Sequence, residues 1–217
     1  MKDYLTIAIP KGRLGDSALN ELNKIGLASY IDESSRKLIF EDEENNIKYM
    51  FVKPVDVITY VSNGVADIGI IGKDNIIEEQ ADVYELLDLK FGLCKFAVAG
   101  LKGNSRYLSD ETIKVATKYP NVASTYFERK NQKIEIIKLN GSVELAPLVG
   151  LADVILDIVE TGSTLKANGL EVFEEIMDIS AKLISNKVSY YFKGKEIKQM
   201  INLLLSKQKE TKNATNY

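Results

Sequence analysis

Short apolar runs alternate along the chain with stretches in which apolar residues recur every three or four positions. The runs predict buried strands, and the wider spacing predicts helices that bury one face. Predicted strands cover residues 5–9, 37–41, 47–52, 67–71, 96–100, 113–117, 132–138, 153–156, 171–179 and 182–187. Predicted helices cover residues 15–26, 54–62, 120–130, 143–149, 161–168 and 196–207, and the last ten residues are expected to be frayed. This alternation predicts an α/β protein.

The domain boundary has to come from the order of these elements, because no Pro-, Gly- or Ser-rich linker divides the chain. A second set of strands and helices begins near residue 91, and the last strands and helix lead back to the first set. We therefore expect two lobes, residues 1–90 with 177–217 and residues 91–176. The segments that cross between them would be strands rather than a flexible linker.

Composition excludes several kinds of chemistry. The 217 residues are 45% hydrophobic and 27% charged, as in ordinary globular proteins, and the net charge of -3 argues against a general nucleic-acid surface. No signal peptide or membrane span is visible, so the expected location is the cytoplasm. Histidine is absent and Cys94 is the single cysteine, which excludes Ser-His-Asp triads, Cys-His pairs, His-ligated metals and an intrachain disulfide. A bound metal would be a hard cation such as Mg²⁺.

Residues 153–165, DVILDIVETGSTL, carry the sharpest local signal. A predicted strand ends in acidic residues, and Thr-Gly-Ser-Thr at 161–164 opens a helix. Glycine lets the backbone turn tightly, and the amides and hydroxyls at a helix start can hold a phosphate. On this pattern alone, a capped helix that binds nothing is equally consistent. Asp157 and Glu160 upstream favour binding, and the segment resembles the loop of phosphoribosyltransferases that binds phosphoribosyl pyrophosphate (PRPP).

Residues 9–14, IPKGRL, place two cations and a glycine after a predicted strand. Ligands of open α/β folds bind at the carboxyl ends of strands, where Lys11 and Arg13 could hold phosphates. Taken alone, this loop fits a solvated basic surface better. Weaker segments of the same kind are SRKL (35–38), VKPVDV (52–57), DIGIIGKD (67–74) and LNGSVELAP (139–147). Together they predict a cleft for an anionic ligand.

Seven segments in one order resemble the ATP phosphoribosyltransferase family. They are KGRL, SRKLIF, KPVDV, DIGIIGKD, ATKYPNVA, KLNGSVELAPLVGLAD and DIVETGSTLKANGL, and the resemblance covers roughly residues 5–190. The chain stops soon after the second lobe, so it resembles the short form of the family, which lacks a C-terminal ACT-like regulatory domain. The resemblance implies a fold like type II periplasmic binding proteins, with two α/β lobes and the active site in the cleft between them.

The resemblance also implies a reaction, a cofactor and partners. N1 of the ATP adenine would attack C1 of PRPP, releasing pyrophosphate and forming phosphoribosyl-ATP in the first step of histidine biosynthesis. N1 is a neutral nucleophile with a free lone pair, so this pentosyltransferase (glycosyltransferase) needs no strong general base. Mg²⁺ would be held mainly by substrate phosphates rather than by a fixed protein site. The partner would be a regulatory subunit similar to histidyl-tRNA synthetase, in a hetero-oligomer, with this chain also forming a homodimer.

The residues that match the family's motifs fall into two binding groups. The expected PRPP-binding group is Asp153, Asp157, Glu160, Thr161, Gly162, Ser163 and Thr164. The expected ATP- and phosphate-binding group is Lys11, Gly12, Arg13, Arg36, Lys53 and Glu144. Arg13 and Arg36 are also expected to be catalytic, by stabilising the departing pyrophosphate. Lys53 stands where many members carry arginine, so a bidentate contact is lost there.

Two other interpretations are open at this point. A non-catalytic ligand-binding protein of the same fold would share the two lobes, although a secreted receptor would need an export signal. Another PRPP-dependent transferase, acting on a nucleobase, would share the Asp-to-Thr-Gly loop but need not carry KGRL and SRKL. Identification of the product separates these possibilities.

Overall fold

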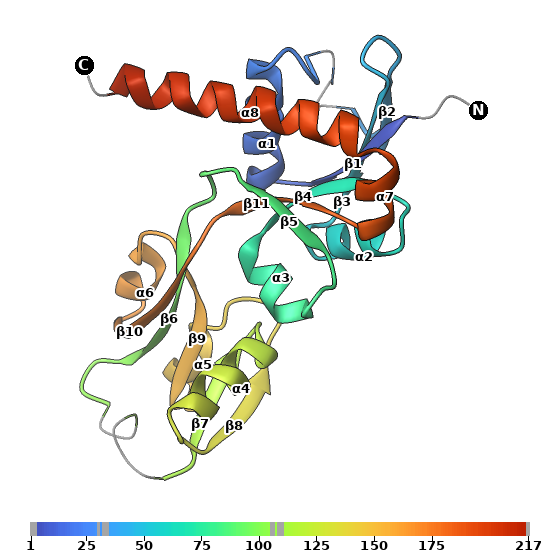
Figure 1. Cartoon of the computed structure of the whole chain (residues 1–217). Coiled ribbons are helices and arrows are strands. Elements are labelled where there is room, and N and C mark those ends of the chain that lie inside the picture. Colours follow the sequence, from blue (N-terminus) through green and yellow to red (C-terminus); the bar gives the residue numbers. More distant parts are fainter. Residues whose placement is uncertain (1–3, 30, 32–34, 105–106, 108–110, 216–217) are drawn as a thin grey trace. The chain divides into compact units, whose positions relative to one another are not determined.

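The protein folds into two compact units, each built on a mixed β-sheet with helices (Figure 1). Its structure, a computed structural model, describes residues 4–29, 31, 35–104, 107 and 111–215, with only the backbone for 211–215. Unit 1 comprises Met1–Ile76, Ala81–Gly92 and Ser180–Tyr217, and unit 2 comprises Ile77–Gln80 and Leu93–Ile179. The two main boundaries therefore follow Gly92 and Ile179, where the sequence suggested residues 90 and 176, and the short segment Ile77–Gln80 also groups with unit 2.

Unit 1 contains a six-stranded sheet in the order β2-β3-β1-β4-β11-β5. The strands are β1 (Leu5–Pro10), β2 (Ile39–Asp42), β3 (Ile47–Val52), β4 (Ile68–Gly72), β5 (Tyr84–Asp88) and β11 (Ala181–Ser185). β1 is parallel to both β3 and β4, whereas β2 is antiparallel to β3, and β11 is antiparallel to β4 and β5. Three strands of this sheet consequently end at one edge.

Helices pack on both faces of this sheet. They are α1 (Arg13–Lys24), α2 (Val57–Ser62) after the 3-10 turn η1 (Pro54–Asp56), α3 (Lys73–Glu79), α7 (Lys187–Phe192) and α8 (Gly194–Thr215). Ile7 and Ile9 of β1 belong to a core that includes α1 and α8, and Ala8 between them belongs to the core with α2. Strand alternation thus explains the nearly continuous apolar run of β1.

Unit 2 contains a five-stranded sheet in the order β10-β6-β9-β7-β8. Its strands are β6 (Cys94–Leu101), β7 (Ile113–Thr117), β8 (Ile134–Lys138), β9 (Val154–Val159) and β10 (Leu170–Ile179), and its helices are α4 (Pro120–Arg129), α5 (Leu145–Leu148) and α6 (Ser163–Ala167). β7 is parallel to β8 and β9, and β6 is antiparallel to β9 and β10. Val154 and Leu156 of β9 pack in the α4 core, and Ile155 packs with α5 and α6.

The α/β prediction is confirmed, with corrections near the C-terminus. The last ten residues were expected to be frayed, but α8 continues to Thr215, so that expectation is wrong for residues 208–215, while residues 216 and 217 lie outside the described part of the chain. The predicted strand at 182–187 ends at Ser185, because the side chain of Asn186 accepts a hydrogen bond from Ser189 N at 2.7 Å and caps α7. Helix α3, strand β5 and helix α7 were not predicted.

Candidate functional site

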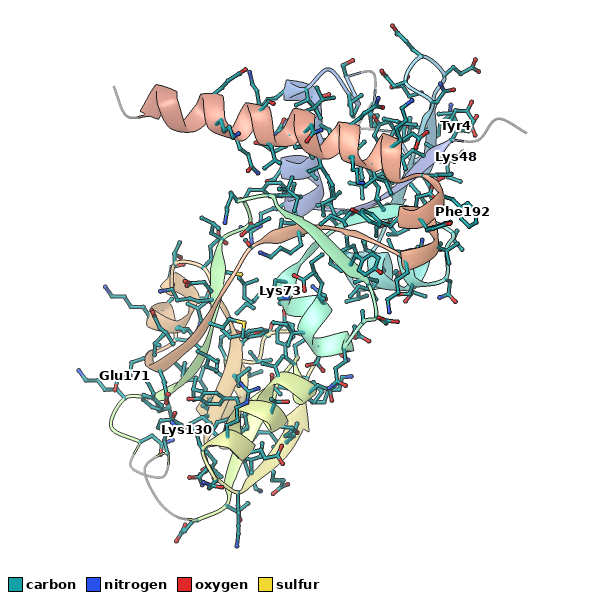
Figure 2. The ribbon with its side chains drawn as sticks, in the orientation of Figure 1. Tyr4, Lys48, Lys73, Lys130, Glu171 and Phe192 are labelled. Atoms are coloured by element: carbon teal, nitrogen blue, oxygen red, sulfur yellow. The ribbon has the colours of Figure 1, made fainter. Side chains whose placement is uncertain are left out.

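The parallel strands of unit 1 bring two predicted cations together. Pro10 of β1 stands opposite Val52 of β3 in the ladder, and Lys11 N donates to Val52 O at 2.8 Å. Lys11 and Lys53 therefore follow their strands at neighbouring positions, and both are exposed. Lys73 (Figure 2), which follows β4 at this edge, is instead paired with Glu85 of β5.

Arg36 reaches the same edge from the opposite direction. Strand β2 is antiparallel to β3, and Phe51 N donates to Leu38 O at 2.8 Å, so the residues before β2 lie beside the end of β3. Arg36 is two positions before Leu38 and is exposed. The register of the sheet thus gathers Lys11, Arg36 and Lys53 at one edge, although they are far apart in the sequence.

The start of α1 places Arg13 next to these cations. Gly12 has a φ of +89° and precedes the helix, and Arg13, its first residue, is exposed. Gly15 packs directly on the end of β1, because a Cβ there would lie 1.8 Å from the carbonyl oxygen of Pro10. Only glycine fits at this position. Gly15 was not among the predicted site residues, although its place directly after KGRL is a usable signal in the sequence.

Three parallel strands of unit 2 also end at one edge, and the Thr-Gly loop follows one of them. Strand β9 leads through the exposed Glu160 into residues 161–164, and β8 leads into the turn before Glu144, the residue that precedes α5. Ile155 and Val159 pack with α5 and α6, so Asp157 between them faces the same side of the sheet. Asp157 is half-buried and stands opposite Ala97.

The Thr-Gly loop has the backbone that a close turn requires. Gly162 is in the left-handed region with a φ of +72°, and Lys166 N donates to Gly162 O at 3.0 Å in the first turn of α6. The hydroxyls of Thr161 and Ser163 lie 2.9 Å apart, and Ser163 N makes a long 3.4 Å bond to Thr161 Oγ1. This weak cap leaves exposed hydroxyls beside the helix start, where an anion could accept from them.

The start of helix α4, at the same edge, is capped by a side chain of the protein. Helix α4 follows β7, and the carboxylate of Glu78 accepts from Asn121 N and Val122 N, at 3.1 Å from each. Burial raises the pKa of Glu78, and the two backbone hydrogen bonds act in the opposite direction. With α4 already capped by a carboxylate, the loop before α6 is the better candidate for an external phosphate.

Asp153 lies at the opposite end of β9 from the loop. Its Oδ2 accepts from Lys114 N at 2.8 Å, and its carbonyl accepts from Asn104 Nδ2 at 2.7 Å. At about 3.3 Å per residue, β9 separates Asp153 from residues 161–164 by roughly 20 Å. The structure therefore does not bring Asp153 together with the other PRPP-binding candidates, and its carboxylate instead serves the junction of β7 and β9.

A resident metal site is not built into the described parts of the chain, where no three Asp, Glu or Cys side chains gather closely enough to hold an ion. A divalent cation would fit here through phosphate oxygens of a ligand together with one or two carboxylates such as Asp157. None of the helices among the described residues is long and apolar enough to span a bilayer.

Two α/β units, each with polar or cationic residues beyond the ends of its parallel strands, define a protein of the two-lobed α/β class. The family model for HisG, ATP phosphoribosyltransferase, matches residues 53–206. The ATP phosphoribosyltransferase of Clostridioides difficile (strain 630) is 64% identical over 201 residues, covering 93% of this chain and 97% of the relative. That of Thermoanaerobacter sp. (strain X514) is 54% identical over 201 residues, covering 92% and 93%. The chain belongs to the ATP phosphoribosyltransferase family, whose members are pentosyltransferases.

Solved structures agree with this assignment. The ATP phosphoribosyl transferase (HisG:HisZ) complex from Thermotoga maritima contains a chain that is 39% identical, with a TM-score of 0.81 and coverage of 93% of this chain and 97% of that one. The VFT2 domain of Bordetella pertussis BvgS is only 12% identical, with a TM-score of 0.59 and coverage of 94% and 87%, and it shares the fold alone. The predicted fold class is confirmed.

Proposed function

We propose that this chain transfers the phosphoribosyl group of PRPP to N1 of the ATP adenine, releasing pyrophosphate and forming phosphoribosyl-ATP, the first step of histidine biosynthesis. The observation that carries the proposal is the 64% identity to a named ATP phosphoribosyltransferase over 93% of the chain. The chemistry suits a protein without histidine, because N1 of adenine needs no strong base to make it nucleophilic.

The proposed PRPP site is built on the end of β9. Amides and hydroxyls of residues 161–164 would hold the 5-phosphate, and the left-handed Gly162 lets the backbone approach it. Asp157 and Glu160 would accept hydrogen bonds from the ribose hydroxyls. Support comes from their placement, since Asp157 faces the α6 side of the sheet and Glu160 leads directly into the loop. Glu144 is a further candidate near the ribose.

The cations of unit 1 are proposed to bind ATP phosphates and pyrophosphate. Lys11 and Lys53 supply charge at the ends of β1 and β3, and Gly12 supplies the turn between β1 and α1. Arg13 and Arg36 would contact the pyrophosphate, whose negative charge grows as the bond to C1 breaks. Accurate positioning of two polyanionic substrates can lower the barrier by about 7–11 kcal/mol in favourable systems, which is the main contribution that we assign to the protein.

Mg²⁺ is the proposed metal, held by substrate phosphates with Asp157 as the candidate protein ligand. When bound, it would offset negative charge on the pyrophosphate group. The protein's own residues would still orient the ribose, so that C1 of PRPP faces N1 of the adenine.

A HisZ-type subunit, similar to histidyl-tRNA synthetase, is the proposed regulatory partner. The Thermotoga maritima complex contains such a subunit beside a chain that is 39% identical to this one. We also propose a homodimer of this chain within the hetero-oligomer, and a cytoplasmic location.

The function is tested by incubating the purified chain with ATP, PRPP and Mg²⁺ and following pyrophosphate release together with the mass of the product. Replacing ATP by 1-deaza-ATP, which has a C–H in place of N1, should abolish product formation while nucleotide binding persists. Turnover of adenine or another nucleobase, with none of ATP, would favour the other transferase interpretation. Binding of PRPP without any turnover would favour the non-catalytic interpretation.

A further inference from the structure

A buried hydroxyl joins two strands at the functional edge of unit 2. Thr117, the last residue of β7, is 0% exposed, and its Oγ1 donates to Leu156 O of β9 at 2.6 Å. The same oxygen accepts from Tyr119 N at 2.8 Å. A continuous chain of hydrogen bonds therefore runs from the Tyr119 amide through the Thr117 hydroxyl to the Leu156 carbonyl.

This hydroxyl acts where the backbone ladder stops. Strands β7 and β9 pair as far as Thr117 and Leu156, after which the chain of β7 turns away through Tyr119 into α4. Strand β9 continues for three more residues, and these pair only with β6 on the other side. The Thr117 hydroxyl thus replaces a backbone donor at the last rung.

The carbonyl that accepts this bond is joined by the peptide bond to Asp157. Asp157 stands opposite Ala97 of β6, and the β7 side of its peptide is held by the bond from Thr117. We propose that Thr117 is a positioning residue that fixes Asp157, and the loop that follows it, for the ribose phosphate of PRPP. This inference rests on the proposed function, because it concerns the residues assigned there to PRPP.

The chain offers a matched hydroxyl that should have only a structural role. Ser185, the last residue of β11 in unit 1, is also 0% exposed, and its Oγ donates to Asp67 O at 2.8 Å. Both hydroxyls are buried at a strand end and bonded to a backbone carbonyl. Loss of either should lower stability, but only loss of the Thr117 hydroxyl should change PRPP recognition.

The experiment uses the series Thr117→Ser, Thr117→Cys and Thr117→Val, with Ser185→Ala as the control. Serine keeps the hydroxyl, cysteine offers a weak donor, and valine keeps the shape without a donor. The KM for PRPP, the KM for ATP and kcat are measured together with the melting temperature, and PRPP affinity is measured by calorimetry on the same samples. We expect Thr117→Val to raise the KM and Kd for PRPP about tenfold, with cysteine intermediate and serine close to the wild type.

Several outcomes would overturn the proposal. One is a PRPP affinity that stays the same in all Thr117 variants. Another is an equal rise in the KM for PRPP and the KM for ATP, with the same rise in Ser185→Ala. If valine prevents folding, the cysteine and serine variants still decide, because a graded loss of PRPP affinity with unchanged ATP affinity is required. The activity of the wild-type protein distinguishes a failure of the proposed function from a failure of the role assigned to Thr117. Absence of phosphoribosyl-ATP there rejects the proposed function, whereas normal turnover with a flat PRPP series rejects only the role of Thr117.

Discussion

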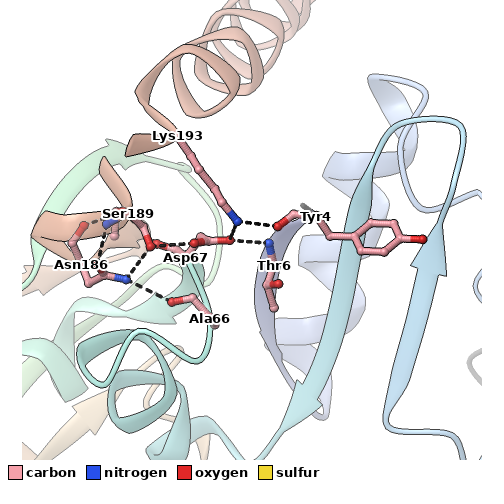
Figure 3. A network of polar contacts seen from close by, with 8 residues as sticks. Tyr4, Thr6, Ala66, Asp67, Asn186, Ser189 and Lys193 are labelled. Atoms are coloured by element: carbon pink, nitrogen blue, oxygen red, sulfur yellow. Dashed lines mark hydrogen bonds and ion pairs between the residues drawn. The ribbon is translucent and has the colours of Figure 1, made fainter. Parts of the chain in front are cut away.

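Lys193 Nζ lies 2.9 Å from Asp67 Oδ2, and this ion pair joins the residue before α8 to the residue before β4 (Figure 3). Lys193 also donates to Tyr4 O at 2.6 Å. Asp67 in turn accepts from Thr6 N at 2.8 Å and from the hydroxyl of Ser189 at 2.6 Å. Because Asp67 is only 7% exposed, these donors compensate for the burial of its charge, and they tie the first strand to the C-terminal helices.

Replacing Asp67 with alanine should therefore destabilise unit 1 without touching the candidate site. The change removes the acceptor of the Thr6 amide and the charged partner of Lys193, which keeps its hydrogen bond to Tyr4 O, and we expect the free energy of unfolding to fall by about 3 kcal/mol. The control is Asp82→Ala, which breaks the exposed pair between Asp82 and Lys187 and should change the stability little, because solvent screens exposed charges. If urea denaturation gave the same loss of unfolding free energy for both variants, the Asp67 network would stabilise the protein no more than an exposed ion pair does.

Gly162→Val should weaken PRPP binding through backbone strain rather than collision. A Cβ at Gly162 would meet Val159 Cγ1 at 3.8 Å, an ordinary contact, but the φ of +72° is costly for a β-branched residue. With a strain of about 1–2 kcal/mol, we expect PRPP affinity to fall at least about tenfold. Gly103→Val is the control, because Gly103 has a φ of +78°, open space around it and no place in the loop. Unchanged PRPP binding in calorimetry would remove the loop from the site.

Arg13→Ala and Arg36→Ala should lower kcat more than they raise KM. If these guanidinium groups contact the departing pyrophosphate, their contribution grows in the transition state, and we expect a loss of about 2–4 kcal/mol in the activation free energy. Arg129→Ala, at the exposed end of α4, supplies the control for loss of one surface charge. Steady-state kinetics with normal kcat and raised KM values would limit both arginines to ground-state binding.

Much of the fold could be predicted because the strands and long helices carry strong periodic patterns. The elements that were missed are short or lack such a pattern. Helix α3 has seven residues and directly follows the buried strand β4, and β5 is a sheet-edge strand with partly exposed residues. The end of α8 was missed because its sequence is polar, yet a polar helix can extend beyond the surface that it covers once its first turns are packed.

The individual residues of the candidate site could be predicted from the sequence, but which of them lie close together could not. The gathering of Lys11, Arg36 and Lys53 depends on the strand order and register, which no local pattern specifies. Asp153 illustrates the limit, because an acidic residue at either end of a buried strand looks the same in the sequence. Only the structure shows that Asp153 precedes β9 and bonds to Lys114, whereas Asp157 lies near the loop.

Stability at acidic pH should depend on Glu174 in unit 2. Its carboxylate accepts from Lys130 (Figure 2) and from the hydroxyl of Tyr107 at 2.8 Å. Hydrogen bonds, chiefly from Lys130, lower the pKa of Glu174 from 4.5 to about 2. Because the folded pKa lies below the unfolded one, the stabilisation is complete above pH 4.5 and is lost as the pH falls towards 2.

Glu174→Gln should therefore reduce the change of the unfolding free energy with pH between pH 4.5 and about 2. Urea denaturation at a series of pH values measures this change. The control is Glu175→Gln, which removes the neighbouring exposed carboxylate that pairs with Lys95. Parallel curves for the wild type and Glu174→Gln would contradict the assignment. Since Glu174 is partly exposed, we expect the effect to weaken in high salt.

Histidine inhibition should require the HisZ-type subunit. We expect the isolated chain to make phosphoribosyl-ATP, the partner to raise its activity, and histidine to inhibit only the complex. Feedback requires a second site whose ligand distinguishes two states of the enzyme, and we expect that site to lie on the proposed regulatory partner.

The coupling must also be reciprocal, so if histidine weakens PRPP binding to the complex, saturating PRPP must weaken histidine binding by the same factor. Calorimetric titration of histidine into the complex, with and without PRPP, measures that factor directly. A complex with Gly162→Val is the control, because it should still bind histidine but lose the response to PRPP. Inhibition of the isolated chain by histidine, competitive with neither substrate, would instead place an allosteric site on this chain.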